Sequence, residues 1–332
     1  MKIVILEAAS LGKSVSLEGF RRFGEVIVYQ TTTAEEIGDR IRDADILVIN
    51  KLKLNAETLK TAEKLKYITI TSTGVDCIDL AYTASRGIQV ANIRGYSTDS
   101  VAQHTLTLLL FLLEKLSYYD NFVKSGAYSG DTTGSYYNVN YHEISRKRWG
   151  IVGLGNIGRR VAELAGAFGA EVVYCSVSGK NVQKDYEMVD FDTLVKTSDI
   201  ISIHTPLTEA SRHLFCDEVF QKMKRSAVLI NVARGPVVDE RSLVKALKEG
   251  LIAGAGLDVM ETEPLPADSP LLELQDSTKL VITPHIGWAS VESRQRSVDE
   301  VLKNIEAYVG GVERNIVMHR KIRELEELLC LQ

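Results

Sequence analysis

The sequence predicts an α/β protein made of two doubly wound parallel sheets, each in a domain of its own. Short apolar runs alternate with amphipathic stretches along most of the chain, which is typical of βαβ units. One of these units, at residues 147–176, contains a glycine-rich turn with the spacing of a dinucleotide-binding fingerprint. At 332 residues the chain is long for one core and long enough for two.

Five apolar runs near the start of the chain predict a small parallel sheet. They lie at residues 1–6, 25–29, 45–49, 65–70 and 87–91. Thr33 and Glu36 have the spacing of a capping box ahead of an amphipathic turn, so a helix is expected between the second and third strands. No glycine fingerprint follows the first strand. We therefore expect this domain not to bind a dinucleotide in the way the second one does.

A Ser/Thr/Gly turn follows the fourth strand, in the sequence TSTGVDCIDL. Such a turn places backbone N–H groups at the edge where open α/β sheets bind ligands. Gly74 and Val75 are the candidates for gripping a carboxylate. An ordinary strand-to-helix turn would have the same sequence features, so both interpretations stay open at this point.

Residues 97–116 predict a long helix that is apolar on nearly every side beyond its first turn. A helix of this kind must be covered all round, so we expect it to run between the two domains or into a subunit interface. Residues 124–143 then have no helical or strand period and are rich in Gly, Ser and Tyr. A long irregular segment is usually functional or interfacial, and its tyrosines suit a partner surface, although a merely mobile loop is the alternative.

The fingerprint unit predicts nucleotide binding. Trp149–Val152 is an apolar strand that ends in three glycines, and a helical pattern follows them before a second strand at Val172–Cys175. Gly153 permits a tight turn, Gly155 lets the backbone approach a pyrophosphate, and Gly158 lets the helix lie close to the strand. The helix N-terminus would then face the phosphates.

The fingerprint lacks the acid that usually follows the second strand and holds the adenosine ribose 2′-OH. Its place falls near Ser176. An acid there would repel a 2′-phosphate, whereas Ser176, Ser178 and Lys180 could supply donors and a positive charge to one. The sequence therefore favours NADPH over NADH, and a polar loop that still accepts NADH is the alternative.

Four more apolar runs complete the second sheet, at residues 199–206, 227–235, 253–259 and 279–288. The clearest helix between them is capped by Asp239 and ends before Gly250. A further helix is expected from Ser290 to Gly310, and residues 323–332 read as a short amphipathic helix. Because this tail has no sheet of its own, we expect it to return and pack on the first domain.

Composition excludes several classes of partner. Charged residues make up 25% of the chain, the net charge is −5 and no basic block runs along a face, so neither nucleic acid nor an anionic membrane is expected. The most apolar segment, 106–113, is far shorter than the roughly 20 residues of a membrane span. Four scattered cysteines without metal-ligand spacing, and no secretory leader, favour a reducing cytoplasm and no metal site.

Polar residues directly after the strands of the second sheet are the candidates for chemistry, because ligands bind beyond the carboxyl ends of parallel strands. They are His204, Arg234, Asp258, Glu261, Glu263 and His285. Arg suits a substrate carboxylate, and His suits proton transfer near neutral pH. Spacing alone does not choose between His204 and His285. Arg234 could be a structural ion-pair partner and Glu263 a solvated loop acid.

Five ordered motifs resemble one family over essentially the whole chain. GLGNIG, HTPLT, NVARGPVVDE, GLDVMETEP and TPHIGWAS, with STGVD in the first domain, are similar to the D-isomer-specific 2-hydroxyacid dehydrogenases. The opening strand, INK at 49–51, YSTDSVAQ at 96–103 and PHIGWAS are most similar to the glycerate dehydrogenase, or hydroxypyruvate reductase, branch of that family.

The resemblance implies a role for each motif. Arg234 matches the arginine that holds the substrate carboxylate and carbonyl, Glu263 the acid that hydrogen-bonds the catalytic imidazole, and His285 the general acid/base. His204 falls in the motif that lines the cofactor. Gly74 and Val75 match the backbone grip on the carboxylate, and Lys51 and Trp288 resemble pocket residues. Beside the three glycines, Ser176 and Lys180, the expected cofactor contacts are Asn156, Ile157, Thr205, Pro206, Val232, Ala233, Asp258 and Gly287.

The resemblance also implies the architecture and the reaction. Residues 1–97 and 288–332 would form a flavodoxin-like substrate domain and residues 98–287 a Rossmann dinucleotide-binding domain, with a cleft between them and a homodimer formed through residues 97–116 and the following loop. The implied reaction is NAD(P)H-dependent reduction of a short 2-oxo acid such as hydroxypyruvate or glyoxylate. The alternatives are D-lactate or phosphite dehydrogenase, or a dinucleotide-sensing, corepressor-like regulator. A formate dehydrogenase would be expected to lack the equivalent of Glu263.

Overall fold

The computed structural model describes residues 1–130, 139–179 and 182–317. The chain divides into two compact units, one formed by Met1–Ser97 together with the chain from Ala289 onward, the other by Thr98–Trp288. Each unit has its own parallel sheet, so the predicted α/β class with two doubly wound sheets is confirmed. Lys180 and the expected helix at 323–332 lie outside the described residues. Among the described residues, no helix is both long enough and apolar enough to span a bilayer.

The first unit contains a five-stranded sheet in the order β2-β1-β3-β4-β5, with every strand parallel to its neighbours. The strands are β1 (Lys2–Ile5), β2 (Glu25–Val28), β3 (Ile46–Ile49), β4 (Tyr67–Ile70) and β5 (Gln89–Ala91). This is the flavodoxin-like order, in which the order of the strands reverses between β1 and β3 while all strands stay parallel. All four residues of β3 and of β4 are buried, because helices or turns cover both faces of these central strands.

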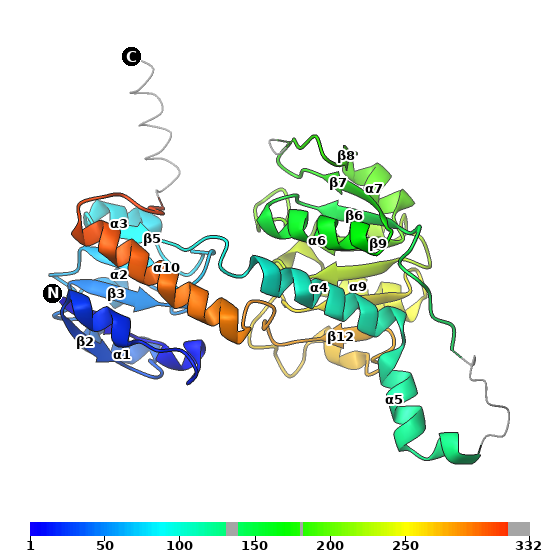
Figure 1. Ribbon diagram of the computed structural model, residues 1–332, viewed down its shortest axis with the longest axis horizontal. Helices are drawn as coiled ribbons and strands as arrows, with labels where there is room; N and C mark the ends of the chain where they lie inside the picture. Colours follow the sequence, from blue (N-terminus) through cyan, green and yellow to red (C-terminus); the bar gives the residue numbers. More distant parts are fainter. Residues whose placement is uncertain (131–138, 180–181, 318–332) are drawn as a thin grey trace. The chain divides into compact units, whose positions relative to one another are not determined.

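Short helices connect these strands, and the end of the chain returns to the same sheet (Figure 1). The connecting helices are η1 (Ala8–Leu11), η2 (Glu18–Phe23), α1 (Ala34–Arg40), α2 (Ala56–Leu59) and α3 (Leu80–Ser85). The returning segment forms the long helix α10 (Val291–Val309). Glu36 accepts a 2.8 Å bond from the backbone N–H of Thr33, as the capping-box spacing predicts. Ser290 caps α10 through the N–H of Ser293, and Ile316 then forms a bridge to Ala91 of β5. The expected return of the C-terminal segment to the first domain is therefore observed as far as residue 317.

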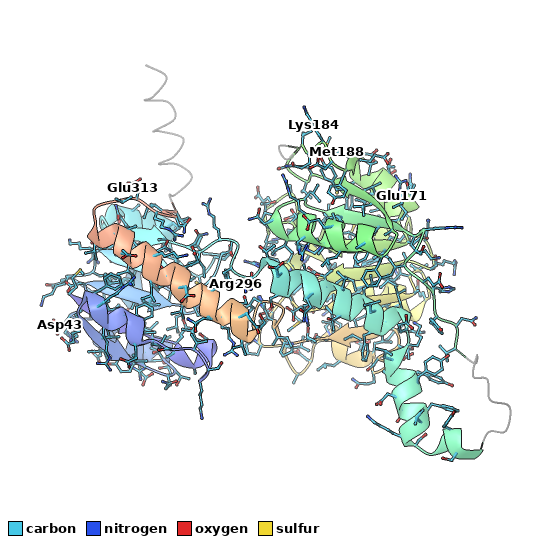
Figure 2. The ribbon with its side chains drawn as sticks, viewed as in Figure 1. Asp43, Glu171, Lys184, Met188, Arg296 and Glu313 are labelled. Atoms are coloured by element: carbon cyan, nitrogen blue, oxygen red, sulfur yellow. The ribbon has the colours of Figure 1, made fainter. Side chains whose placement is uncertain are left out.

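The second unit contains a seven-stranded parallel sheet in the order β12-β11-β10-β9-β6-β7-β8. The strands are β6 (Arg148–Val152), β7 (Glu171–Cys175), β8 (Glu187–Met188), β9 (Ile200–Ile203), β10 (Val228–Asn231), β11 (Gly254–Leu257) and β12 (Leu280–Ile282). The order reverses at β6 and β9, as in dinucleotide-binding sheets. The edge strand β8 is short and exposed, which limits pairing with other chains. Figure 2 labels Met188, which belongs to β8, and Lys184, which precedes it.

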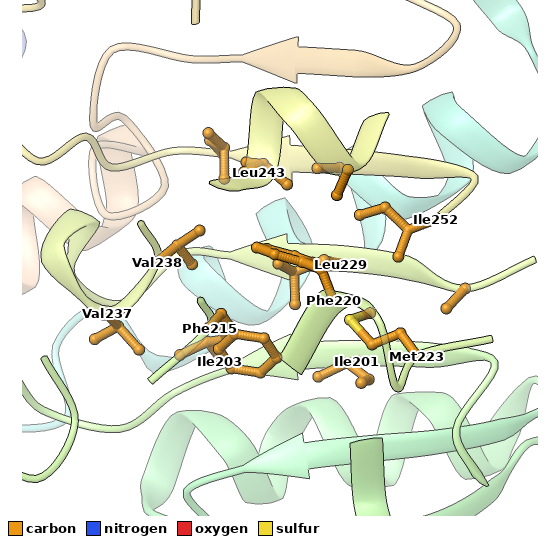
Figure 3. Packing of buried hydrophobic residues seen from close by; sticks show 14 of the residues in the cluster. Ile201, Ile203, Phe215, Phe220, Met223, Leu229, Val237, Val238, Leu243 and Ile252 are labelled. Carbon is orange, nitrogen blue, oxygen red and sulfur yellow. The ribbon is translucent and has the colours of Figure 1, made fainter. Parts of the chain in front are cut away.

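Two apolar cores lie on the two faces of this sheet, because alternate residues of each strand point to opposite sides. On one face, α4 (Thr98–Leu113) and α6 (Asn156–Ala167) pack on Trp149, Ile151 and Ile230. On the other face, α7 (Phe191–Thr197), α8 (Asp217–Phe220) and α9 (Glu240–Lys248) pack on the intervening residues Ile201, Ile203 and Leu229. Figure 3 shows this second core with Phe215, Phe220 and Leu243 against the strands. The remaining short helices are η3 (Ala127–Gly130), η4 (Gly235–Val237) and η5 (Pro270–Glu273).

The helix predicted at 97–116 is shorter than expected, and this chain alone does not cover it on every side. It ends at Leu113, because Lys115 adopts a left-handed conformation (φ 53°) and a new helix, α5 (Leu116–Lys124), begins after it. Seven residues of α4 are buried within the second unit, but Gln103 and Thr107 are exposed and form a polar stripe with Asp99. The segment is mostly apolar, and for that reason the stripe was not expected from the sequence. The residues of the stripe are four positions apart, so they all lie on one side of the helix.

Two glycines of α6 have opposite surroundings. A Cβ on Gly158 would lie 2.2 Å from the carbonyl oxygen of Gly153, whereas a Cβ on Gly166 would meet no atom within 4 Å. We expect Gly158→Ala to lower the free energy of unfolding by about 1–3 kcal/mol, because the helix must move away from the strand. Gly166→Ala should raise it by roughly 0.5–1 kcal/mol, because alanine loses less backbone entropy in an exposed helix. Urea unfolding without cofactor measures both, and equal effects would contradict this account.

Candidate active site at the carboxyl edge of the second sheet

Five parallel strands of the second unit end at one edge, and every candidate for chemistry follows one of them. Gly153 follows β6, His204 and Thr205 follow β9, Arg234 follows β10, Asp258 follows β11 and His285 follows β12. Because the strands are parallel, these residues share the edge where open α/β sheets bind ligands. The strand order reverses between β6 and β9, so the glycine turn lies at the topological switch point.

The glycine turn has the geometry that a bound pyrophosphate requires. Gly153 adopts φ 95°, and a Cβ there would lie 2.9 Å from the backbone nitrogen of Thr205. Gly155, the N-cap of α6, has no atom within 4 Å of its ideal Cβ position, so its backbone is open to close approach. The N-terminus of α6 begins at Asn156 and Ile157 and presents its positive dipole end there. These residues fit the phosphates of a dinucleotide.

The segment after β10 is held by a side chain that sequence reasoning did not single out. Asn231, fully buried, donates from Nδ2 to the carbonyl oxygen of Arg234 at 3.0 Å and accepts from the N–H of Ala233 at 3.1 Å. Both bonds close the turn at Val232 and Ala233 and fix the point from which the Arg234 side chain leaves. Arg234 also donates from Nη1 to the carbonyl oxygen of Ala233 at 2.8 Å. The sequence did hold a signal for this role, because an amide side chain at the end of a buried strand must find hydrogen-bond partners nearby.

His285 and Glu263 contact each other. Nδ1 of His285 lies 2.8 Å from Oε2 of Glu263, and each side chain is about a quarter exposed, at 25% and 26%. The other carboxylate oxygen of Glu263 accepts the N–H of Met260 at 3.2 Å, which ties the side chain to its own loop. His285 adopts φ 56°, a left-handed conformation that residues other than glycine rarely adopt. Such a conformation persists where the surroundings fix it, and is common at functional sites.

Asp258 provides that fixation. Its buried carboxylate accepts the hydroxyl of Thr283 at 2.6 Å and the backbone N–H groups of Ile286 and Gly287 at 2.8 Å each. Nε2 of His104, from α4, lies 3.3 Å from the same carboxylate. Burial alone would raise the pKa of Asp258, but the bonds from His104, Thr283 and the two backbone N–H groups outweigh it and hold the pKa below its usual value.

His204 differs from His285 in its surroundings. Nε2 of its ring lies 3.0 Å from the hydroxyl of Ser202, and Nδ1 is buried with no hydrogen-bond partner among the described residues. Burial lowers the pKa of His204 to about 3, so the ring is neutral at physiological pH and cannot supply a proton there. The structure thus separates two histidines that strand-end spacing could not.

The remaining predicted contacts of this unit lie at the same edge or next to it. Thr205 and Val232 are buried, and Pro206 accepts the hydroxyl of Ser211 through its carbonyl oxygen at 2.8 Å. Ser176 follows β7, and Trp288 packs partly buried against the core that contains α4 and α6. In the described part of the chain, no group of three or more His, Cys, Asp or Glu side chains is arranged to hold a metal ion.

In the first unit, Lys51 follows β3, and Gly74 and Val75 follow β4 at the carboxyl edge of that sheet. Sequence reasoning missed Glu7, which follows β1 at the topological switch point. Its carboxylate accepts the backbone N–H groups of Asn50 at 2.7 Å, Lys51 at 3.0 Å and Leu52 at 3.1 Å. An acid directly after an apolar strand was the signal for this contact.

Comparison with known proteins agrees with this geometry. A family profile described as D-isomer specific 2-hydroxyacid dehydrogenase, NAD binding domain, matches residues 106–287. The chain is 38% identical over 317 residues to a glycerate dehydrogenase of Methylorubrum extorquens, covering 95% of this chain and 98% of that protein.

Solved structures of similar proteins share the fold along almost the whole chain. An acyclic imino acid reductase in complex with NADPH and D-Arg superposes with a TM-score of 0.85 at 30% identity, over 96% of this chain and 100% of that one. The D-lactate dehydrogenase of Aquifex aeolicus, complexed with NAD and lactic acid, superposes with a TM-score of 0.83 at 30% identity, over 96% and 99% of the two chains.

Asp258→Asn should expose the contribution of this carboxylate to stability. The amide places a donor opposite at least one of the bonded N–H or O–H groups, so we expect a loss of about 1–3 kcal/mol in the free energy of unfolding at pH 7. Because the folded pKa of Asp258 is lowered, the difference from wild type should persist above about pH 4, near the unfolded pKa, and shrink below it. Urea unfolding between pH 7 and 3 measures this. Exposed Asp268→Asn is the control, and a difference that stays constant with pH would contradict the interpretation.

Proposed function

The chain belongs to the D-isomer specific 2-hydroxyacid dehydrogenase family, and from that premise we propose that it reduces a short 2-oxo acid, of the hydroxypyruvate or glyoxylate type, to the D-2-hydroxy acid. The overall reaction converts the 2-oxo acid, NAD(P)H and a proton to the 2-hydroxy acid and NAD(P)⁺. When bound, the cofactor supplies the hydride that reaches C2 of the substrate. The chain's residues must hold the anion, orient it and deliver the proton.

The observation that carries this proposal is the contact between His285 and Glu263. With Nδ1 at 2.8 Å from a carboxylate oxygen, the imidazole ring is held in one orientation. Nε2 is then the ring nitrogen that would face the substrate and donate to its carbonyl oxygen. Glu263 acts in this scheme by orienting the ring and offsetting its charge.

Arg234 is proposed to hold the substrate. Its planar guanidinium can pair with the carboxylate and also polarise the neighbouring carbonyl, which a lysine could not do with the same geometry. The closed turn made by Asn231 supports this role, because it fixes the backbone from which the guanidinium extends. Lys51, Gly74, Val75 and Trp288 are proposed as further substrate contacts, on the strength of their motifs and of strand-end positions for the first three.

NADPH is proposed as the favoured cofactor, with NADH as the alternative. The glycine turn and the N-terminus of α6 support the pyrophosphate contacts, and Thr205, Pro206, Val232, Ala233, Asp258 and Gly287 are proposed to line the remaining cofactor site. Ser176 follows β7 where an acid would repel a 2′-phosphate. Ser176 and Lys180 are therefore proposed to contact that phosphate.

A spectrophotometric panel of 2-oxo acids with NADH and NADPH in parallel tests the proposal. We expect hydroxypyruvate or glyoxylate to give the highest kcat/KM, ahead of pyruvate, and kcat/KM to be higher with NADPH than with NADH.

His285→Ala should lower turnover at least about 100-fold, because proton transfer is lost, while the cofactor Kd stays within about threefold. His142→Ala, an exposed histidine elsewhere, is the control. Unchanged turnover in His285→Ala would remove this residue from the mechanism, and no reduction of any 2-oxo acid would overturn the function.

A homodimer formed through α4 and the segment after it is also proposed. Leu116, Val123 and Tyr128 are about half exposed, at 49%, 55% and 50%, which is a high proportion of apolar surface for so short a segment. Light scattering is expected to give about twice the chain mass of 36.8 kDa, and the double variant Leu116→Ser, Val123→Ser should shift the population toward monomer. A monomeric wild-type protein at micromolar concentration would contradict the proposal.

A further inference from the structure

Two glutamates exchange hydrogen bonds between the loops that follow β10 and β11. The backbone N–H of Glu240 donates to Oε1 of Glu261 at 3.0 Å, and the backbone N–H of Glu261 donates to Oε1 of Glu240 at 2.7 Å. Glu240 is the first residue of α9, where backbone N–H groups have no partner within the helix. Glu261 therefore caps α9 from another loop, and Glu240 fixes that loop in return.

The hydrogen bonds between Glu240 and Glu261 involve a buried carboxylate, that of Glu240. Glu240 is only 8% exposed, and a buried carboxylate is costly unless its oxygens are hydrogen-bonded. The N-terminus of α9 offsets part of its charge, and the N–H of Glu261 offsets more. Glu261 has a second neighbour, since its carboxylate lies 3.5 Å from Nε2 of His213. Nδ1 of the same ring lies 3.8 Å from Asp239, so His213, from the segment between β9 and α8, lies beside an acid of each loop.

The two loops also touch through their backbones. A Cβ on Gly235, the residue after Arg234, would lie 1.9 Å from the carbonyl carbon and oxygen of Met260. The N–H of Met260 donates in turn to Glu263. The backbone at 260–263 is thus fixed by Gly235 on one side and by Glu240 at Glu261, only two residues before the carboxylate that contacts His285.

We propose that Glu240 and Glu261 are positioning residues, which hold the loop at 260–263 so that the Glu263 carboxylate stays within hydrogen-bond distance of His285. This inference rests on the proposed function. Neither glutamate touches the reacting atoms in this scheme. Their effect reaches the chemistry through the backbone of Met260 and the orientation of Glu263, and a displacement of about 1 Å in such a group can cost up to a hundredfold in rate.

Glu240→Ala is the test variant, compared with Glu240→Gln, whose amide oxygen can still accept the N–H of Glu261. We expect Glu240→Ala to lower kcat by about tenfold or more, with the substrate KM and the cofactor Kd within about threefold of wild type. Glu240→Gln should restore kcat to within about threefold. Glu36→Ala is the matched control, since it removes another glutamate that accepts a backbone N–H at a helix start, in the first unit.

An NMR measurement that does not depend on turnover tests the positioning of Glu263 separately from the proposed function. In protein labelled with ¹⁵N-histidine, the Nδ1 resonance of His285, assigned with His285→Asn, should shift in Glu240→Ala and return toward wild type in Glu240→Gln. If the wild type reduces no 2-oxo acid, the proposed function fails, while this signal still tests the positioning. An Ala variant with wild-type kcat and a wild-type His285 resonance would overturn the inference. Should Glu240→Ala not fold, Glu261→Ala, with its more exposed side chain, must give the same changes.

Discussion

The hydrogen bond between His285 and Glu263 depends on two turns that leave neighbouring strands. β11 and β12 are parallel and in register, with Leu257 opposite Ile282, so the chain segments beyond them start side by side at the same edge. One segment contributes Glu263 and the other His285. The pairing of the two strands is therefore enough to bring the two segments near each other, before any contact between the side chains is considered. A distance of 2.8 Å requires more, because neither turn has a regular structure that would fix its course.

Buried carboxylates fix these turns. Asp258 accepts the N–H groups of Ile286 and Gly287, and so determines the conformation of the His285 turn. On the other side, Glu240 and Glu261 cap each other's backbone beside the Glu263 loop. An apolar core would be cheaper to bury, but it lacks direction, whereas a carboxylate that accepts two N–H groups specifies their positions to a few tenths of an ångström. A left-handed residue such as His285 is then held by hydrogen bonds that partly offset its backbone strain.

Sequence patterns predicted the strands and the order of the motifs, because both depend on local periodicity and on the rule that parallel strands share a carboxyl edge. The capping box at Thr33 and the cap at Asp239 were likewise local. Contacts between distant segments were out of reach. Nothing in the spacing of residues relates His104 to Asp258, or Glu7 to the backbone at 50–52, since these pairs meet only after the sheets have formed. The burial that separates His204 from His285 is similarly a property of the folded core.

In the proposed mechanism, His285 and Glu263 cannot by themselves select a substrate, because the imidazole meets only the carbonyl oxygen to which it donates its proton. Selection must come from groups that meet the rest of the substrate. The first unit, considered by itself, has polar and charged groups at its own switch point that bear on which anions could bind there. There, three backbone N–H groups converge on the Glu7 carboxylate, an arrangement that could otherwise attract a free anion. Because Glu7 already fills this position, an anionic substrate near β1 and β3 would depend on the positive charge of Lys51 rather than on those N–H groups. A doubly charged anion at this edge of the first sheet would then also meet the negative charge of Glu7, so the edge is better suited to a singly charged anion.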